Sequence, residues 1–309
     1  MTPGARVLAV MEILDDYLLG KPENKLLLNW FRRNRYAGSK DRLAIRNLFF
    51  NCLRYKLSCY WPFEQAGFSI TGRSIVLGML QLSGESFDQI FDGMRYSPKN
   101  LSNLEKIVID NFDENILIAP AFVKLNFPEF LEDSFKNSFG NGFWDNLTSL
   151  NTQANLYVRI NRIKCNPDLA IKSLKKDGIK VELIPNFKNS LKIIEKKRLL
   201  NRSEAYLSGK VEIQDISSQA VVNFINPKKN TKILDFCAGA GGKTLAMASL
   251  TLGKSEFYVH DIDQSKLLNL KLRCKRAGVQ VKTLSLKNAI KKNIKFDLVV
   301  ADVPCSGTG

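Results

Sequence analysis

The apolar residues of this chain follow two different periods, a helical one at first and a strand-like one further on. Between residues 3 and 110 they recur every three or four positions, which is the spacing of helices that bury one face. One stripe ends near Gly20, the next helix begins at Ser39 or Asp41, and another covers residues 74–82. The first two stripes consist of Val7, Leu8, Met11, Leu14, Tyr17 and Leu18, and of Ile45, Leu48, Phe49, Cys52 and Leu53. We predict an all-helical domain over residues 1–140.

The period changes at residues 155–162, where apolar and polar side chains alternate as they do in a strand. A helix over residues 167–177 and a strand over residues 179–184 follow, so we predict a small α/β arm over residues 141–210. Beyond it we expect strands at 233–236, 257–260, 279–284 and 296–301, and a helix at 263–277. This alternation is typical of a parallel sheet covered by helices, and it predicts a Rossmann-like α/β domain over residues 211–309.

A glycine-rich turn joins the first strand of that domain to the helix that follows. The run reads Ile233-Leu-Asp-Phe-Cys-Ala-Gly-Ala-Gly-Gly-Lys-Thr244. Glycines let the backbone come close to a ligand, and the N-terminus of the following helix favours polar or anionic groups. Asp261 and Asp263 follow the next strand, at the spacing used to hold a ribose by its hydroxyls. The arrangement predicts a pocket for an adenosine-type cofactor.

The register of the glycines separates the possible cofactors. A P-loop needs a glycine where Cys237 stands, and the dinucleotide fingerprint needs a third glycine where Thr244 stands. A looser turn, with Asp235 on the preceding strand, suits a cofactor without a phosphate chain, and S-adenosylmethionine is such a cofactor. We therefore favour a methyltransferase, with a dinucleotide enzyme and an NTPase as alternatives.

The charge balance points to a polyanionic partner. The 309 residues include 46 Lys and Arg against 30 Asp and Glu, a formal net charge of +16. Such a surplus favours nucleic acid first and an acidic membrane surface second. Residues 30–60 carry eight basic side chains against one acid, and residues 160–210 carry thirteen against five. Because aromatic side chains are interleaved with the first group, it is either an RNA-phosphate surface or a solvated helix face. The second group suits a substrate arm.

Cysteine usage and hydropathy exclude other classes of protein. Six cysteines without a Cys-x-x-Cys pair, together with one histidine, predict neither a structural metal site nor a disulfide framework. No apolar run approaches the roughly 20 residues that span a bilayer. The first residues also lack the pattern of a signal peptide. We expect a cytoplasmic protein that uses no metal and no membrane.

The fourth expected strand of the Rossmann-like domain ends in a cysteine motif, Asp302-Val-Pro-Cys-Ser-Gly-Thr-Gly309. It lies at the carboxyl edge, where ligands of such sheets bind. A thiol at this place suits a carbon target, because carbon 5 of cytosine becomes nucleophilic only after a thiolate adds to carbon 6. Chemistry alone therefore indicates Cys305 as the attacking nucleophile.

These motifs together resemble the Sun/Fmu (Nop2-related) family of RNA 5-methylcytosine methyltransferases, and especially its bacterial members that act on small-subunit ribosomal RNA. The matching segments are Gly209 with residues 214–219, then residues 234–244, 261–263, 275–278 and 302–309, and in the arm residues 156–164. The N-terminal helices resemble the NusB-like RNA-binding region of the family.

The resemblance implies S-adenosylmethionine as cofactor and ribosomal RNA as partner, with the protein acting as a monomer. The residues implied in cofactor binding are Cys237, Ala238, Gly239, Ala240, Gly241, Gly242, Lys243, Asp261 and Asp302. The resemblance also changes the role of Cys305. In this family the attacking thiolate comes from a later Thr-Cys-Ser segment, and the cysteine of the Pro-Cys segment assists release of the methylated base.

Two features depart from the family pattern. Lys287 or Asn288 stands near the position of an acid that contacts the adenosine moiety. Residues 1–309 contain no Thr-Cys-Ser segment, and the apolar strand at 298–300 would keep an unpaired edge. We therefore expect an incomplete Rossmann-like core in a truncated, inactive chain. The leading hypothesis is a methyltransferase that acts on cytosine carbon 5 of ribosomal RNA through a covalent cysteine adduct. The alternative is a catalytically inactive, truncated RNA-binding protein.

Overall fold

The computed structural model describes residues 1–285 and 293–304, and the chain forms two compact units. Unit 1 comprises Met1–Gln153 and unit 2 comprises Ala154–Gly309. Throughout the described ranges, no helix is long and apolar enough to cross a membrane. The same ranges hold no group of three or more His, Cys, Asp and Glu side chains that could bind a metal ion. The division into three domains stays a prediction.

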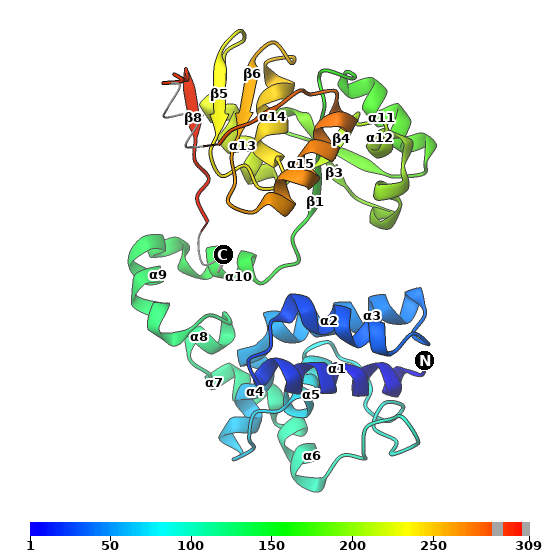
Figure 1. The fold of residues 1–309 in the computed structure, drawn as a ribbon. Coiled ribbons are helices and arrows are strands. Elements are labelled where there is room, and N and C mark those ends of the chain that lie inside the picture. The colour runs from blue at the N-terminus through cyan, green and yellow to red at the C-terminus, as the bar shows by residue number, and fades with distance from the viewer. Residues whose placement is uncertain (286–292, 305–309) are drawn as a thin grey trace. The chain divides into compact units, whose positions relative to one another are not determined.

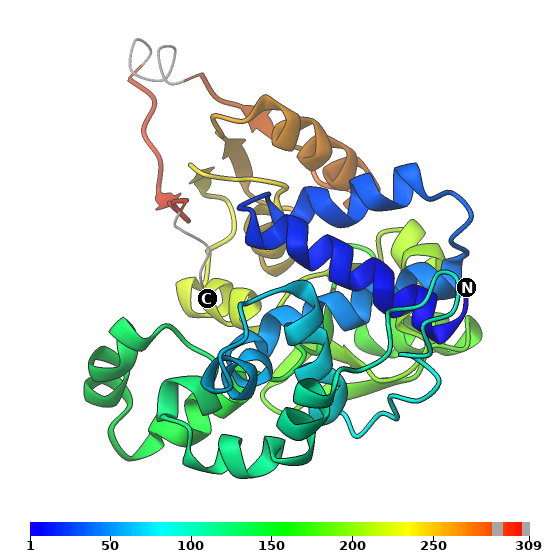
Figure 2. The ribbon, with the colours of Figure 1, turned by 90° about the horizontal axis from the view of Figure 1, so that it is seen from below.

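Unit 1 is built from helices joined by loops (Figures 1 and 2). Its helices are α1 (Pro3–Leu18), α2 (Glu23–Arg33), α3 (Ser39–Arg54), α4 (Lys56–Gln65), α5 (Gly72–Leu82), α6 (Asn103–Asp110), α7 (Phe112–Ile118), α8 (Ala121–Lys124), α9 (Glu132–Phe139) and α10 (Phe143–Leu150), with short 3₁₀ turns at Glu129–Leu131 and Gly140–Gly142. Helix α2 was not predicted, although Leu26 and Leu27 are buried and Trp30 and Phe31 follow them at helical spacing. The arginines in the last turn of the helix interrupt its apolar pattern.

Local sequence explains where the main helices of unit 1 begin. Thr2 caps α1, because its Oγ1 accepts a hydrogen bond from the Ala5 amide at 3.1 Å, and Thr71 caps α5 in the same way. The helices then bury aromatic side chains in one core, where Phe49, Phe63 and Phe112 are fully buried. Burying each such ring stabilises the fold by about 1.5–3 kcal/mol.

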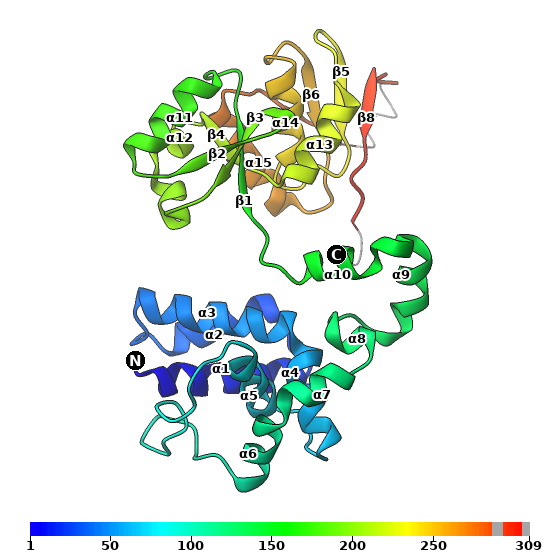
Figure 3. The ribbon, with the colours of Figure 1, turned by 180° about the vertical axis from the view of Figure 1, so that it is seen from behind.

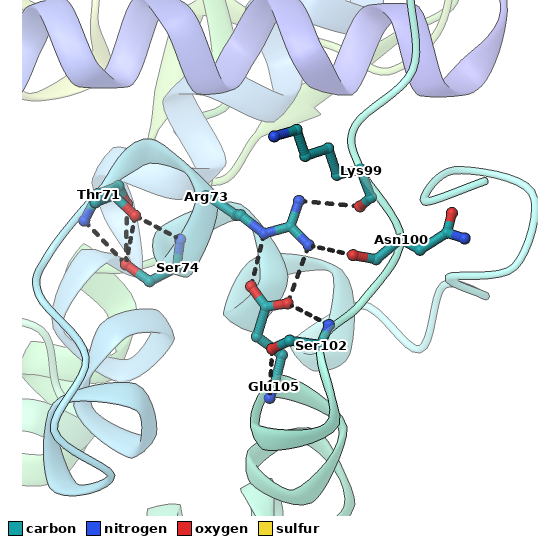
Figure 4. Close-up of polar contacts among 7 residues, drawn as sticks. All are labelled: Thr71, Arg73, Ser74, Lys99, Asn100, Ser102 and Glu105. Carbon is teal, nitrogen blue, oxygen red and sulfur yellow. Dashed lines mark hydrogen bonds and ion pairs between the residues drawn. The ribbon is translucent and has the colours of Figure 1, made fainter. Parts of the chain in front are cut away.

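An ion pair fastens the loop before α6 to α5 (Figure 4). Arg73 on α5 donates to both carboxylate oxygens of Glu105 at 2.6 and 3.0 Å, and also to the carbonyl oxygens of Lys99 and Asn100, each at 3.1 Å. The Glu105 carboxylate accepts from the Ser102 amide at 2.8 Å, which completes a capping box at the start of α6. Burial alone would raise the pKa of Glu105, but the hydrogen bonds from Arg73 and Ser102 and the charge of Arg73 together outweigh burial and lower that pKa.

Unit 2 begins with an antiparallel sheet in the order β2-β3-β1-β4. Its elements are β1 (Leu156–Ile160), α11 (Pro167–Lys176), β2 (Val181–Ile184), β3 (Phe187–Ile193), a 3₁₀ segment at Lys197–Arg202, α12 (Glu204–Leu207) and β4 (Val211–Ile213). Val158 and Ile160 on β1 join Leu174 of α11 in one buried cluster, so one face of the sheet is covered by that helix. Strand β3 was not predicted, because its polar residues interrupt the apolar pattern.

A parallel sheet in the order β7-β6-β5-β8 forms the rest of unit 2 and lies beside the first sheet (Figures 1 and 3). Its elements are α13 (Ile216–Ile225), β5 (Lys232–Asp235), α14 (Gly242–Leu250), β6 (Glu256–Val259), α15 (Gln264–Ala277), β7 (Lys282–Thr283) and β8 (Leu298–Val300). In chain order the strands lie as 3-2-1-4, the arrangement of a Rossmann-like sheet. The Rossmann-like α/β fold predicted from the sequence is thus confirmed.

The register of the parallel strands decides where a ligand can bind. Asp235, the last residue of β5, pairs with Val259 on β6 and with Val300 on β8. The chain order reverses between β5 and β8, and in open α/β sheets ligands bind outside the carboxyl ends of the strands at this point. The glycine turn that follows β5 and Asp302 beyond β8 therefore meet at the same edge.

Candidate cofactor site

A cavity of about 230 Å³ lies at this edge of the parallel sheet. It is lined by Gln214, Ser218, Asp235, Cys237, Ala238, Gly239, Ala240, Gly242, Lys243 and Asp302. The residues come from the start of α13, from the end of β5 with the glycine turn, from the first turn of α14, and from the segment after β8. Four stretches that are distant in sequence thus converge on one hollow.

Two glycines give the turn its shape. Gly239 and Gly241 have φ angles of 53° and 85°, in the left-handed region that side chains with a Cβ disfavour. A Cβ on Gly241 would lie 2.8 Å from Cγ of Leu270 on α15, so helix packing also requires a glycine there. A Cβ on Gly239 would meet nothing within 4 Å, because this residue faces open space beside the cavity.

Asp261 holds the glycine turn against the end of β6. Its Oδ2 accepts a hydrogen bond from the Gly239 amide at 2.8 Å, and its Oδ1 accepts one from the Asp263 amide at 2.9 Å. The Ala238 amide donates to the His260 carbonyl oxygen at 2.9 Å. Asp261 does not line the cavity, and Asp263 caps α15 by accepting from the Ser265 amide at 2.9 Å. In this structure both acids order backbone.

Asp235 is the buried acid of the cavity. It is 2% exposed, and its Oδ2 accepts a hydrogen bond from the Thr244 hydroxyl at 2.6 Å. Its Oδ1 is buried and has no hydrogen-bond partner in the described part of the chain. Burial raises the pKa of Asp235, while the Thr244 hydrogen bond and the nearby Lys243 act in the opposite direction. A buried acceptor without a donor is costly, and a ligand that donates a hydrogen bond would relieve that cost.

Lys243 and Asp302 close the cavity from two sides. Lys243 Nζ lies 2.5 Å from Asp302 Oδ2, and the two side chains are 18% and 59% exposed. The pair links the glycine turn to the segment after β8. Because Asp302 is mostly exposed, the pair adds little to stability, and its value lies in fixing the position of both side chains.

Most of the cofactor-binding residues predicted from the sequence come together here, and some do not. Gly241 and Asp261 shape the turn without lining the cavity. Cys305, Lys287 and Asn288 lie outside the described residues. Sequence reasoning did not include the cavity residues Gln214, Ser218 and Asp235 among the binding residues. The signal for Asp235 was present, since a carboxylate that ends an apolar strand is buried at a cost.

Comparison with known families gives two matches on this chain. The profile of the family described as 16S rRNA methyltransferase RsmB/F matches residues 222–309, and that of an RsmF/B-like, ferredoxin-like methyltransferase domain matches residues 127–199. Ribosomal RNA small subunit methyltransferase B of Photorhabdus laumondii is 29% identical over 186 residues, which are 59% of this chain and 43% of that protein. The probable methyltransferase B of Bacillus subtilis is 29% identical over 157 residues, 49% of this chain and 35% of that protein. The chain thus spans less than half the length of these relatives.

Solved structures share the fold. PH0851 matches 99% of this chain and 75% of its own length with a TM-score of 0.70 and 21% identity. NSun6 from Pyrococcus horikoshii, solved with SFG, matches 58% of this chain and 71% of its own length with a TM-score of 0.51 and 20% identity. The two profiles, the curated relatives and the shared fold agree with the sequence motifs. The two profiles and the curated relatives thus support the resemblance to the Sun/Fmu (RsmB/F) family that the sequence motifs indicated.

Proposed function

We propose that the cavity beside the glycine turn binds S-adenosylmethionine and that the protein methylates carbon 5 of cytosine in ribosomal RNA. The observation that carries the proposal is Oδ1 of Asp235 at the cavity wall, which has no partner among the described residues. The methionine arm of S-adenosylmethionine has an ammonium group that could donate to this oxygen. A structural neighbour was solved with SFG, an analogue of this cofactor, which supports the assignment.

The charges beside the turn suit a cationic sulfonium cofactor better than a phosphate chain. The first turn of α14 begins at Gly242, but Asp235 and Asp302 place two carboxyl groups at the same cavity. Lys243 offsets the charge of Asp302, and the remaining negative charge would repel a pyrophosphate, whereas a sulfonium and an ammonium carry positive charge. Bound there, S-adenosylmethionine would supply an electrophilic methyl group. Asp235 would bind the ammonium, and the Lys243–Asp302 pair would hold the wall of the cavity in place.

The remaining roles follow from the resemblance and stay proposals. Cys305, three residues after Asp302, would assist release of the methylated base. The attacking thiolate would come from a Thr-Cys-Ser segment, which residues 1–309 do not contain. Residues 1–140 and the arm at 141–210 would bind RNA, and Rossmann-like residues from 211 onward would bind the cofactor. The net charge of +16 and the ribosomal RNA relatives support RNA as the substrate.

Calorimetric titration of the 309-residue chain tests the cofactor assignment without needing the nucleophile. We expect S-adenosylmethionine to bind, and Asp235→Asn to weaken binding about 10- to 100-fold, since a hydrogen bond to a charged group contributes roughly 1.5–3 kcal/mol. Asp168→Asn, the same change at an exposed site on α11, should leave the affinity unchanged. Binding of NAD or ATP in place of S-adenosylmethionine would overturn the assignment, as would equal affinities of the two variants.

Nucleoside analysis tests the reaction. The protein expressed from its native gene should form 5-methylcytidine in a small-subunit ribosomal RNA fragment. Methylation at an exocyclic nitrogen alone would refute the carbon-5 chemistry. RNA binding without any S-adenosylmethionine binding would favour the rival function, an RNA-binding protein without catalysis.

A further inference from the structure

A second cavity of unit 2, of about 320 Å³, lies apart from the glycine turn. It is formed between the antiparallel sheet and the helices α13 and α14. Arg159 and Ser190 line it from strands β1 and β3, and Gln219 and Ala246 line it from the two helices. Its volume exceeds that of the cofactor cavity, and none of the described residues that line it is an acid.

Arg159 is the buried charge of this cavity. It is 6% exposed, on the inner strand β1, where its register partners are Ser190 on β3 and Glu212 on β4. Its Nε donates to Gln214 Oε1 at 2.7 Å. Its Nη1 is buried and has no partner among the residues that the structure describes. A buried guanidinium normally has its donors satisfied, so an unused donor on a residue that lines this cavity indicates a missing acceptor.

The charges around Arg159 favour an anion. Glu212, its cross-strand neighbour, already binds Arg273 at 3.0 Å and Arg276 at 2.6 Å. Three arginine side chains thus share one buried carboxylate, which leaves positive charge in excess. Burial lowers the pKa of Arg159 to about 10, so the side chain is still charged at neutral pH. Exposed Arg162 and Lys188 add two further cations to the lining of the cavity.

We propose that this cavity binds a phosphodiester group of the RNA backbone, with Arg159 as its inner donor and Arg162 and Lys188 at its exposed side. The inference rests on the proposed function for the identity of the polyanion. A guanidinium presents planar donors that match phosphate oxygens, and the amide of Asn189 offers a further polar group. The surplus of basic residues across 160–210 suits a continuing backbone better than an isolated inorganic phosphate.

The site is connected to the cofactor cavity through one side chain. Gln214 accepts from Arg159 Nε through Oε1, and its Nε2 donates to the Gly242 carbonyl oxygen at 3.1 Å. Gln214 itself lines the cofactor cavity. A phosphate held by Arg159 is therefore positioned relative to the glycine turn by two successive hydrogen bonds. The cavity would act in positioning RNA, with no part in the chemistry.

A charge-matched pair of double variants tests the proposal in the full chain. Arg162→Ala/Lys188→Ala removes two cations from the cavity, and Lys172→Ala/Lys175→Ala removes two cations from α11. Binding of a fluorescent single-stranded RNA oligonucleotide is followed by anisotropy at several salt concentrations. We expect the cavity variant to bind at least about tenfold more weakly than the α11 variant. The slope of log K against log salt should also become shallower by about 0.7 for each phosphate that the variant no longer neutralises.

Further measurements distinguish a loss of RNA binding from a loss of S-adenosylmethionine binding. Arg159→Lys keeps the charge but removes the planar donor set, so it should weaken RNA binding while calorimetry still detects S-adenosylmethionine. Equal loss of RNA affinity in the two double variants would overturn the proposal. So would inorganic phosphate binding that depends on Arg159 while RNA binding does not, since the cavity would then be a small-anion site. A selective RNA defect in a chain that binds no S-adenosylmethionine would retain this inference and refute the proposed methyltransferase function.

Discussion

Glu212 on β4 holds together the antiparallel sheet and α15, and its replacement by glutamine should destabilise unit 2 strongly. The side chain is 1% exposed, and its two oxygens bind Arg276 and Arg273 on α15. Arg159 is its neighbour across the sheet. Glu212→Gln keeps the size of the side chain but removes the negative charge that these arginines share. The arginines would then repel one another in a poorly solvated place.

The size of the stability loss in Glu212→Gln depends on how deeply Glu212 and its two arginine partners are buried. Removing one member of a buried ion pair costs about 3–5 kcal/mol. Arg273 and Arg276 are 23% and 19% exposed, so water can compensate in part and the lower value applies. We expect a loss of about 3 kcal/mol, roughly a 100-fold change in the folding equilibrium, since 1.4 kcal/mol is tenfold. Glu256→Gln is the matched control, because Glu256 and Lys282 are 49% and 61% exposed, and it should leave the unfolding free energy almost unchanged.

Urea unfolding measured by circular dichroism gives the unfolding free energies of the Glu212→Gln and Glu256→Gln variants. Trp30, Trp61 and Trp144 all lie in unit 1, so tryptophan fluorescence follows that unit and cannot report on Glu212. Hydrogen exchange of the backbone amides in β1 and β4 localises the effect to unit 2. If Glu212→Gln and Glu256→Gln lower the unfolding free energy by amounts that agree within about 1 kcal/mol, the reasoning from buried charge is wrong.

Two further predictions concern the glycine turn and the acid before it. Gly239→Ala should cost about 1 kcal/mol for its left-handed backbone alone, whereas Gly241→Ala should cost at least about 1 kcal/mol more because its Cβ would press on Leu270; urea unfolding that ranks them equally would contradict this. Burial raises the folded-state pKa of Asp235 above its unfolded value, so the folded form binds the proton more tightly and loses stability as pH rises through that raised pKa. Asp235→Asn should therefore match the wild type in stability at a pH below the unfolded-state pKa and exceed it at higher pH. If the difference in unfolding free energy between the two proteins stays constant with pH, the pKa of Asp235 is not raised by folding.

The spacing of apolar residues, together with the capping and turn residues, was enough to predict much of the fold. The helices α1, α3, α5, α11 and α15 and the strands β5 and β6 lie within a few residues of their predicted places. Their caps and stripes involve residues within one or two turns of each other, so short-range sequence determines them. Helix α2 and strand β3 were not predicted, because basic and polar residues interrupt the apolar pattern of each element. The glycine turn was also predicted, because φ angles of 53° and 85° favour glycine whatever surrounds them.

The sequence by itself determined the turn, and it indicated the family and the cofactor class, because these reside in contiguous motifs. The tertiary structure decided what each charged side chain does. Asp261 orders the turn across 22 residues of sequence, Arg159 reaches Gln214 across 55, and Arg276 reaches Glu212 across 64. No periodicity encodes such pairs, because they arise where two sheets and their helices pack and the burial of each charge depends on its neighbours. The cavity at Arg159 exists for that reason alone.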